Sequence, residues 1–330
     1  MTAQHAGMCT PRCLALLAFV ALSCQGATIT IDASAGLAGN AVALSAFQRA
    51  AARWGAILLD DVGVVIAGDL QPLAAGTIGQ ATTQFGAASY ETVRGGVVAD
   101  AADEPDDAVV ASLPASAPVI SLPAGFSHNG QLWGTTANLR AMGFLTPWVT
   151  TDATITFSSN YSFDFDNSDG VTAGTIDFET VALHEIGHVL GFVSAADYVD
   201  VNFSNPQAVP MYALDLFRFG SPATASEIQN GTRELTPGQL AYFSDGSQSY
   251  LMSTGRLHGD GRQASHWKDG SLTGIMVPAL GAGQVLGLSG ADLRALDVIG
   301  WEINSVPEPS TWAISATGLL ALAWLRRRSA

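Results

Sequence analysis

The chain has 330 residues and is 48% hydrophobic, which is enough to bury a substantial core in one large domain or two ordinary ones. Its formal net charge is −15, because 14 basic residues stand against 29 acidic ones. Nucleic acid is therefore excluded as a partner, since neutralising phosphates needs clustered Lys and Arg.

The first 27 residues are predicted to be a signal peptide. A basic residue precedes an apolar run over residues 13–22, and small residues follow that run. All three cysteines, Cys9, Cys13 and Cys24, lie in this segment. Cleavage near Ala27 leaves a mature chain without cysteine. We therefore expect an exported protein whose stability does not depend on disulfides.

The apolar patterns after the signal peptide predict both helices and strands. This mixture predicts an α+β fold with a mixed sheet, in a single domain over residues 28–303. The expected elements, in chain order, are a helix over 40–59, a strand over 62–70, loops with short strands over 76–123, β-structure over 154–157 and 161–165, and a helix over 177–192.

The last of these helices carries the sequence TVALHEIGHVLGF, residues 180–192. His184 and His188 are four residues apart, so they share one helix face and their ring nitrogens can converge on one zinc ion. Glu185 points beside the metal, where its carboxylate can take a proton from zinc-bound water. Two solvated histidines flanking an acid are the alternative. The apolar surroundings of the motif favour the zinc interpretation.

A hydrolytic zinc site normally has three protein ligands and keeps its fourth position for water. Outside the motif and the signal peptide, the histidines are His128, His258 and His266. His266 and His258 are the candidates for the third ligand, whereas His128 is expected in a surface loop. A carboxylate ligand is the other alternative. The acids considered for that role are Asp197, Asp215 and Glu227.

The pattern over residues 177–301 resembles the leishmanolysin-type metzincins. These zinc peptidases share the HExxHxxGF helix, delay the third histidine by a long insertion and place a methionine turn soon after it. Here Ser194 occupies the position of the third histidine in compact metzincins, while His266 lies in the sequence ASHWKDG and precedes Met276. The resemblance implies that His266 is the third ligand and that Met276 forms the hydrophobic floor beneath the zinc. Gly191 would permit the turn that ends the helix.

A structural calcium ion is a further possibility. Asp164, Asp166, Asn167 and Asp169 lie close together before Gly170, and their oxygens are of the type that calcium prefers. The glycine falls one position late for an EF-hand loop, and no Glu stands at the twelfth position. A turn between a strand and the active-site helix explains the cluster equally well.

Residues 304–330 resemble the PEP-CTERM sorting signal of Gram-negative bacteria. Pro307, Glu308 and Pro309 precede an apolar stretch over 311–325, and three arginines follow at 326–328. The resemblance implies recognition by an exosortase-type enzyme and a destination in the cell envelope, on the outer surface or in the extracellular matrix. About 15 apolar residues fall short of the roughly 20 that span a bilayer, so we expect a short helix with transient membrane contact rather than a permanent transmembrane helix.

Together these patterns predict an exported zinc-dependent endopeptidase that cleaves a protein or peptide substrate with Glu185 as general base. Two alternatives stay open. The first is an envelope or matrix protein that uses a metzincin-like fold for binding without catalysis or with a narrow specificity. The second is zinc-dependent hydrolysis of a non-peptide amide.

Overall fold

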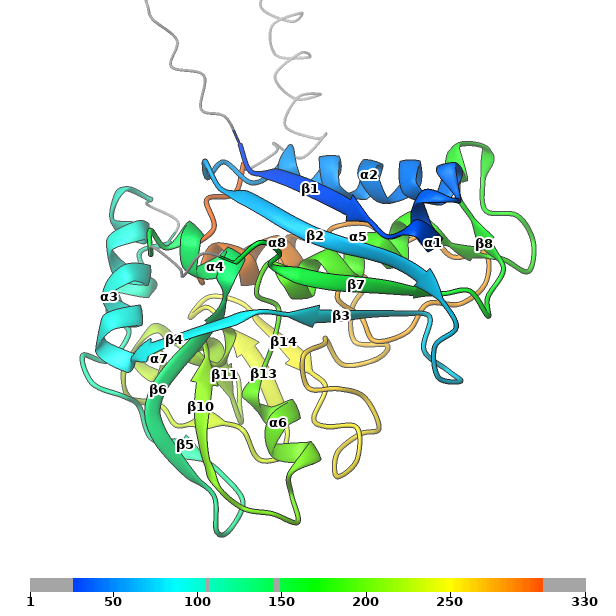
Figure 1. The fold of residues 1–330 in the computed structure, drawn as a ribbon. Helices are drawn as coiled ribbons and strands as arrows, with labels where there is room; N and C mark the ends of the chain where they lie inside the picture. Colours follow the sequence, from blue (N-terminus) through cyan, green and yellow to red (C-terminus); the bar gives the residue numbers. More distant parts are fainter. Residues whose placement is uncertain (1–25, 105–106, 145–148, 305–330) are drawn as a thin grey trace, which may run out of the picture.

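The computed structural model describes residues 26–104, 107–144 and 149–304. Its upper layer is a four-stranded mixed sheet in the order β1-β2-β7-β3 (Figure 1). The first three strands are parallel, whereas β3 runs antiparallel to β7 at the edge. The strands are β1 (Thr28–Ala33), β2 (Gly63–Gln71), β3 (Gly79–Thr83) and β7 (Ala153–Ser158).

Two helices, α2 (Ala41–Gly55) and α5 (Phe178–Val189), pack against one face of this sheet (Figure 1). Phe157 of β7 joins them, because its ring lies 5.0 Å from that of Phe47 and 4.3 Å from that of Phe178. The indole of Trp54 donates a hydrogen bond to the Leu183 carbonyl across the helix pair. The core thus holds α5 firmly against the sheet.

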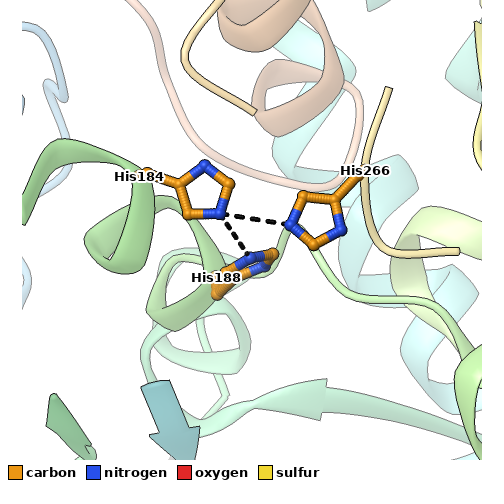
Figure 2. Close-up of side chains that lie close together, drawn as sticks. All are labelled: His184, His188 and His266. Atoms are coloured by element: carbon orange, nitrogen blue, oxygen red, sulfur yellow. Dashed lines mark hydrogen bonds between the residues drawn. The ribbon is translucent and has the colours of Figure 1, made fainter. Parts of the chain in front are cut away.

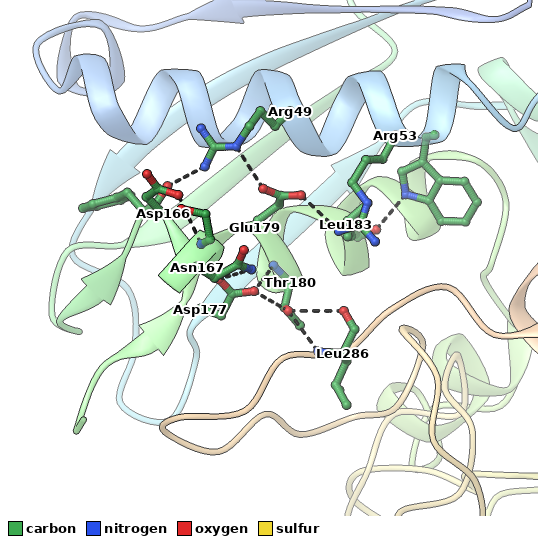
Figure 3. Close-up of polar contacts among 12 residues, drawn as sticks. Arg49, Arg53, Asp166, Asn167, Asp177, Glu179, Thr180, Leu183 and Leu286 are labelled. Atoms are coloured by element: carbon green, nitrogen blue, oxygen red, sulfur yellow. Dashed lines mark hydrogen bonds and ion pairs between the residues drawn. The ribbon is translucent and has the colours of Figure 1, made fainter. Parts of the chain in front are cut away.

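Ion pairs connect the same two helices on their outer side (Figure 3). Arg49 and Arg53 of α2 each lie 3.0 Å from a different carboxylate oxygen of Glu179, which is in the first turn of α5. The Asp177 side chain caps α5 by accepting from the Thr180 backbone N–H at 2.9 Å. A capped and clamped N-terminus therefore fixes the direction of α5.

The lower layer is built from two smaller sheets and short helices, and its sheets have the orders β10-β6-β4 and β14-β13-β11-β12-β5. The pair β8 and β9 lies beside the upper layer, where the Phe163 ring of β8 is 5.2 Å from that of Phe178 in α5 (Figure 1). The strands are β4 (Phe85–Ser89), β5 (Ile120–Ser121), β6 (Ser127–Thr135), β8 (Phe163–Asp164), β9 (Ile176–Asp177), β10 (Ala208–Tyr212), β11 (Arg218–Phe219), β12 (Arg233–Glu234), β13 (Ala241–Ser244) and β14 (Ser249–Met252). The remaining helices are α1 (Ala35–Ala38), α3 (Tyr90–Asp100), α4 (Thr136–Ala141), α6 (Ala195–Val201), α7 (Ala225–Asn230) and α8 (Gly290–Asp297).

The mixed α+β class predicted from the sequence is confirmed, with two corrections in the elements. The first expected helix ends at Gly55 rather than at residue 59, because Leu58 pairs with Ile303 in a β-bridge. The segment expected to hold only loops and short strands contains the helix α3. Its buried residues Tyr90, Val93 and Val97 follow helical spacing, but two adjacent glycines in its centre weaken that pattern.

One buried apolar cluster runs through both layers, from Ala27 near the start of β1 to Trp301 after α8. The indole of Trp301 donates to the Leu190 carbonyl at 2.7 Å, which ties the chain's closing segment to the end of α5. Within the described residues, no helix is long and apolar enough to cross a membrane. The predicted signal peptide before residue 26 and the predicted hydrophobic helix after residue 304 lie outside the described residues.

Candidate metal centre

Three histidines from both layers meet at one point (Figure 2). His184 and His188 come from α5, and His266 comes from an irregular segment of bends and turns after β14. The Nε2 atom of His184 lies 3.2 Å from that of His188 and 3.1 Å from that of His266. Two nitrogens bound tetrahedrally at about 2.0–2.1 Å from a zinc ion would be about 3.3 Å apart, so these separations suit such a site.

Backbone carbonyls fix the proton on each ring. Nδ1 of His184 lies 2.7 Å from the Ile275 oxygen, and Nδ1 of His188 lies 2.7 Å from the Phe192 oxygen. Nδ1 of His266 lies 3.1 Å from the Gln263 oxygen. A carbonyl only accepts, so each Nδ1 is the donor and each neutral ring carries a lone pair on Nε2.

Three lone pairs therefore converge with no proton between them, and the contacts drawn in Figure 2 do not act as hydrogen bonds. Such an arrangement is repulsive unless a cation occupies the point of convergence. Burial and, to a smaller extent, the imidazole of His184 together lower the pKa of His188 to about 3. Burial and the two other imidazoles hold the pKa of His266 well below its usual value. The rings are neutral at pH 7, which is the protonation state that binds metal.

Glu185 lies beside this cluster and is 6% exposed. Burial raises the pKa of its carboxyl to about 8, although a backbone hydrogen bond from Ala81 of β3 opposes the shift. Gly79, on the same strand, leaves room for the carboxyl, because a Cβ there would be 2.7 Å from a Glu185 oxygen. Sequence reasoning missed Gly79, whose role depends on how closely β3 approaches α5.

Met276 lies directly behind the helix that carries the first two histidines. It is 1% exposed, and its sulfur would be 2.4 Å from a Cβ added to Gly187, which stands between His184 and His188 in the sequence. Gly191, after the helix, has a φ of +119°, a conformation that favours glycine. Met276 thus packs against α5, and Gly191 lies in the turn that follows this helix.

Asp292 of α8 holds the methionine turn in place. Its carboxylate accepts from the backbone N–H of Ile275 at 2.8 Å and from that of Met276 at 3.1 Å. It also accepts from the Trp267 indole at 2.7 Å. Since the Ile275 carbonyl orients His184, Asp292 acts on the first histidine through the turn. The sequence around Asp292 gave no signal of this role.

A buried polar framework holds the segment that carries His266. Asp197 of α6 accepts from the backbone N–H of Ala264 at 2.6 Å and from that of Ser265 at 2.9 Å. Arg218 is 2% exposed and donates to the Ala264 carbonyl at 3.2 Å. Asp197 was an alternative metal ligand in the sequence, whereas the structure places it as the support of His266.

The other rival ligands lie elsewhere. His258 stacks on Phe203 with ring centroids 4.3 Å apart, and its Nδ1 lies 3.2 Å from an Asp200 oxygen. Asp215 accepts from the Ser194 hydroxyl at 2.6 Å and from the backbone N–H groups of two further residues. Glu227 forms a capping box at the start of α7. Among the described residues, His184, His188 and His266 are the one group of histidines close enough to share a metal ion.

His128 belongs to strand β6 rather than to the surface loop expected from the sequence. Its register partner is Val209 of the parallel strand β10, so its place depends on pairing with a distant segment.

In the predicted calcium loop, Asp164 accepts from the backbone N–H of Thr172 at 2.7 Å, and Asp166 accepts from that of Ser168 at 3.2 Å. These turn contacts explain the acidic cluster, and calcium stays a prediction.

A cleft of about 720 Å³ opens over the three histidines and Glu185. The strand β3 forms one wall, α5 forms the base, and the segments 256–266 and 275–280 form the opposite side. The cleft therefore lies between the upper sheet and the C-terminal part of the chain.

Comparison with known protein families finds a sorting motif near the C-terminal end of the chain. The family model for the PEP-CTERM protein-sorting motif matches residues 305–328. This match supports an exported protein that an exosortase-type sorting enzyme recognises and that associates with the cell envelope of a Gram-negative bacterium. No curated protein and no solved structure matches the chain.

Proposed function

We propose that the protein is a zinc-dependent endopeptidase with a metzincin-like fold. The observation that carries this proposal is the convergence of three unprotonated Nε2 atoms beside a buried carboxyl group in a cleft. Three imidazoles with an open fourth side are typical of catalytic rather than structural zinc sites. The positions of Met276 and Gly191 and the delayed third histidine support the relation to metzincins.

Each side chain of the site has a distinct task. His184, His188 and His266 would hold the ion, and the carbonyls of Ile275, Phe192 and Gln263 keep their rings oriented. Zinc bound there would supply a Lewis acid that polarises a carbonyl and lowers the pKa of water. Glu185 accepts a proton from the attacking water and delivers it to the leaving amine.

The edge of β3 favours a peptide as substrate. This strand pairs with β7 on one side and is the last strand of its sheet, and its residues line the cleft. The hydrogen bond from Ala81 to Glu185 shows that the outer edge of β3 faces the candidate site. An extended peptide can add to such an edge through its main chain, which places an amide bond next to the catalytic groups.

The test uses residues 28–304, which contain every described strand and helix. We expect about one zinc per chain and cleavage of casein that a chelator abolishes. Glu185→Gln is the matched control, because it keeps the shape of the side chain and removes its basicity. It should retain zinc and folding and lose turnover by at least about 100-fold.

Three outcomes separate the interpretations. Zinc with chelator-sensitive cleavage that Glu185→Gln loses supports the peptidase. Stoichiometric zinc without cleavage of any peptide favours a binding protein on the same scaffold. Absence of zinc from a folded protein contradicts the proposed centre.

A further inference from the structure

The loop over residues 255–262 brings two cations to the cleft. Arg256 and Arg262 both line it, on the same side as His266. The loop is closed at its base, where the Gly255 backbone N–H donates to the Arg262 carbonyl at 3.1 Å. Apart from the three histidines and Glu185, these arginines are the titratable side chains that line the cleft within the described residues.

Two carboxylates hold the loop 255–262 in place by accepting hydrogen bonds from backbone N–H groups in and next to it. Asp200 of α6 accepts from the backbone N–H of Leu257 at 2.7 Å and from that of His258 at 2.8 Å. Asp260 accepts from the Thr254 N–H at 3.1 Å. Gly255 has a φ of +129°, and a Cβ there would be 3.0 Å from the Asp200 carboxylate. The base of Arg256 is thus fixed, although its side chain is exposed.

Arg256 differs from the other cations of the described chain. The other Lys and Arg side chains all pair with carboxylates or donate to backbone carbonyls. Their residues are Arg49, Arg53, Arg94, Arg140, Arg218, Arg233, Arg262, Lys268 and Arg294. Within the part of the chain that the structure describes, Arg256 has no such partner. An unpaired guanidinium at the mouth of a cleft is notable in a chain with a net charge of −15.

The two ends of the cleft differ in chemistry. Near the first turn of α5, Thr180 contacts the backbone of Leu286, and the lining there includes Val181, Val277 and Leu280. At the far end of α5, Val193 lines the cleft and the chain enters α6, whose Asp200 holds the loop 255–262. An extended peptide that crosses the histidines therefore meets apolar side chains at the first end and Arg256 in addition to Val193 at the other.

We infer that the cleft selects peptides that carry a carboxylate on the α6 side of the cleaved bond, with Arg256 as the residue that recognises it. This inference rests on the proposed peptidase function. A guanidinium binds a carboxylate through parallel N–H donors, and no acidic side chain among the described residues pairs with Arg256. Arg262 contributes less, because Asp269 lies 3.0 Å from its guanidinium.

The carboxylate can come from two sources, an Asp or Glu side chain or the C-terminus of the peptide. Both present the same group to Arg256, and three pairs of peptides distinguish them. Two pairs have Glu or Gln next to the cleaved bond, one pair for each side of it. The third pair has a free or an amidated C-terminus on an otherwise identical sequence.

Binding and cleavage are measured separately on the mature protein. The zinc-loaded Glu185→Gln variant reports binding of fluorescent peptides by anisotropy, and the unmodified protein reports kcat/KM. We expect the preferred acidic peptide to bind about fivefold more tightly than its neutral partner at low ionic strength, with the preference decreasing as salt is added.

Substitution of Arg256 tests whether this residue causes the preference for acidic peptides. Arg256→Gln should abolish the preference, so that the acidic and the neutral peptide bind equally, while Arg256→Lys should retain part of the preference. Arg53→Gln is the matched control, since it removes one exposed positive charge from α2, outside the residues that line the cleft. It should change neither peptide's binding.

The results separate this inference from the function on which it rests. Peptides that are cleaved with no carboxylate preference, or with a preference that survives Arg256→Gln, overturn the role of Arg256 and leave the peptidase intact. If no peptide is bound or cleaved, the proposed function fails and the inference fails with it. Loss of the preference on amidation alone assigns the recognised group to the peptide's C-terminus.

Discussion

The two halves of the candidate metal centre are held in different ways. His184 and His188 stand one turn apart on α5, a helix that packs against the sheet and is clamped by Arg49 and Arg53. His266 lies on an irregular segment of bends and turns, and its position depends on hydrogen bonds with side chains of α6 and β11. Helical geometry sets the first pair locally, whereas tertiary contacts set the third ligand.

The metal centre is robust on the α5 side and sensitive on the His266 side. A helix keeps its residues in register as long as it is folded, so the first two imidazoles stay aligned with each other. The imidazole of His266 is aligned only when Asp197 and Arg218 keep their hydrogen bonds to the backbone of the preceding residues. We therefore expect substitutions around His266 to affect metal affinity more than substitutions around the outer face of α5.

The largest expected effect comes from removing the third ligand itself. His266→Ala should lower zinc affinity by more than about 100-fold. Loss of a residue that only orients a metal ligand costs up to about 100-fold, and loss of the ligand itself should cost more. His258→Ala, the rival position, should leave affinity within about threefold of the unmodified protein. Zinc competition with a chromophoric chelator measures both, and the opposite ranking would move the third ligand to His258.

Weakening the support of His266 should have an intermediate effect. Asp197→Asn keeps the shape of the side chain but loses charge-assisted bonds to the backbone of Ala264 and Ser265. Zinc affinity should fall by about 10- to 100-fold. Asp269→Asn, on the exposed surface nearby, serves as control and should have no effect. Equal affinities for all three proteins would show that His266 needs no such support.

The smallest effect is expected on the helix side. Glu179→Gln breaks the ion pairs to Arg49 and Arg53, whose side chains are 43% and 45% exposed. Their exposure limits the loss to about 1 kcal/mol of unfolding free energy. Thermal melting should show a small decrease in Tm, while zinc affinity stays unchanged. A large loss of zinc affinity would mean that the positions of His184 and His188 depend on distant contacts as much as the position of His266 does.

The same distinction explains what the sequence could predict. The spacing of His184, Glu185 and His188 is a local pattern, so the structure brings these residues together as expected. His266 was favoured over His258 through the resemblance, because spacing alone cannot choose between them. The roles of Asp197, Gly79 and Asp292 depend on contacts between distant segments and left no signal in the sequence.

The fold shows a similar division. The helix α2 and the strands β2 and β7 follow from clear apolar periodicity, and all three lie close to their expected positions. The helix α3 was missed because Gly95 and Gly96 interrupt its pattern, and it is stabilised by burial of Tyr90 and its neighbours. Tertiary packing decided the structure where local propensity was weak.

The separation of the ligands along the chain has a consequence for folding. His184 and His266 are 82 residues apart, and all cysteines of the chain lie within its first 24 residues. Unlike a disulfide, a metal ion that binds both histidines does so only once the chain is folded, so its binding free energy adds directly to the stability of the fold. In an exported protein, metal supply outside the cytoplasm would then set how stably the His266 segment is held against α5.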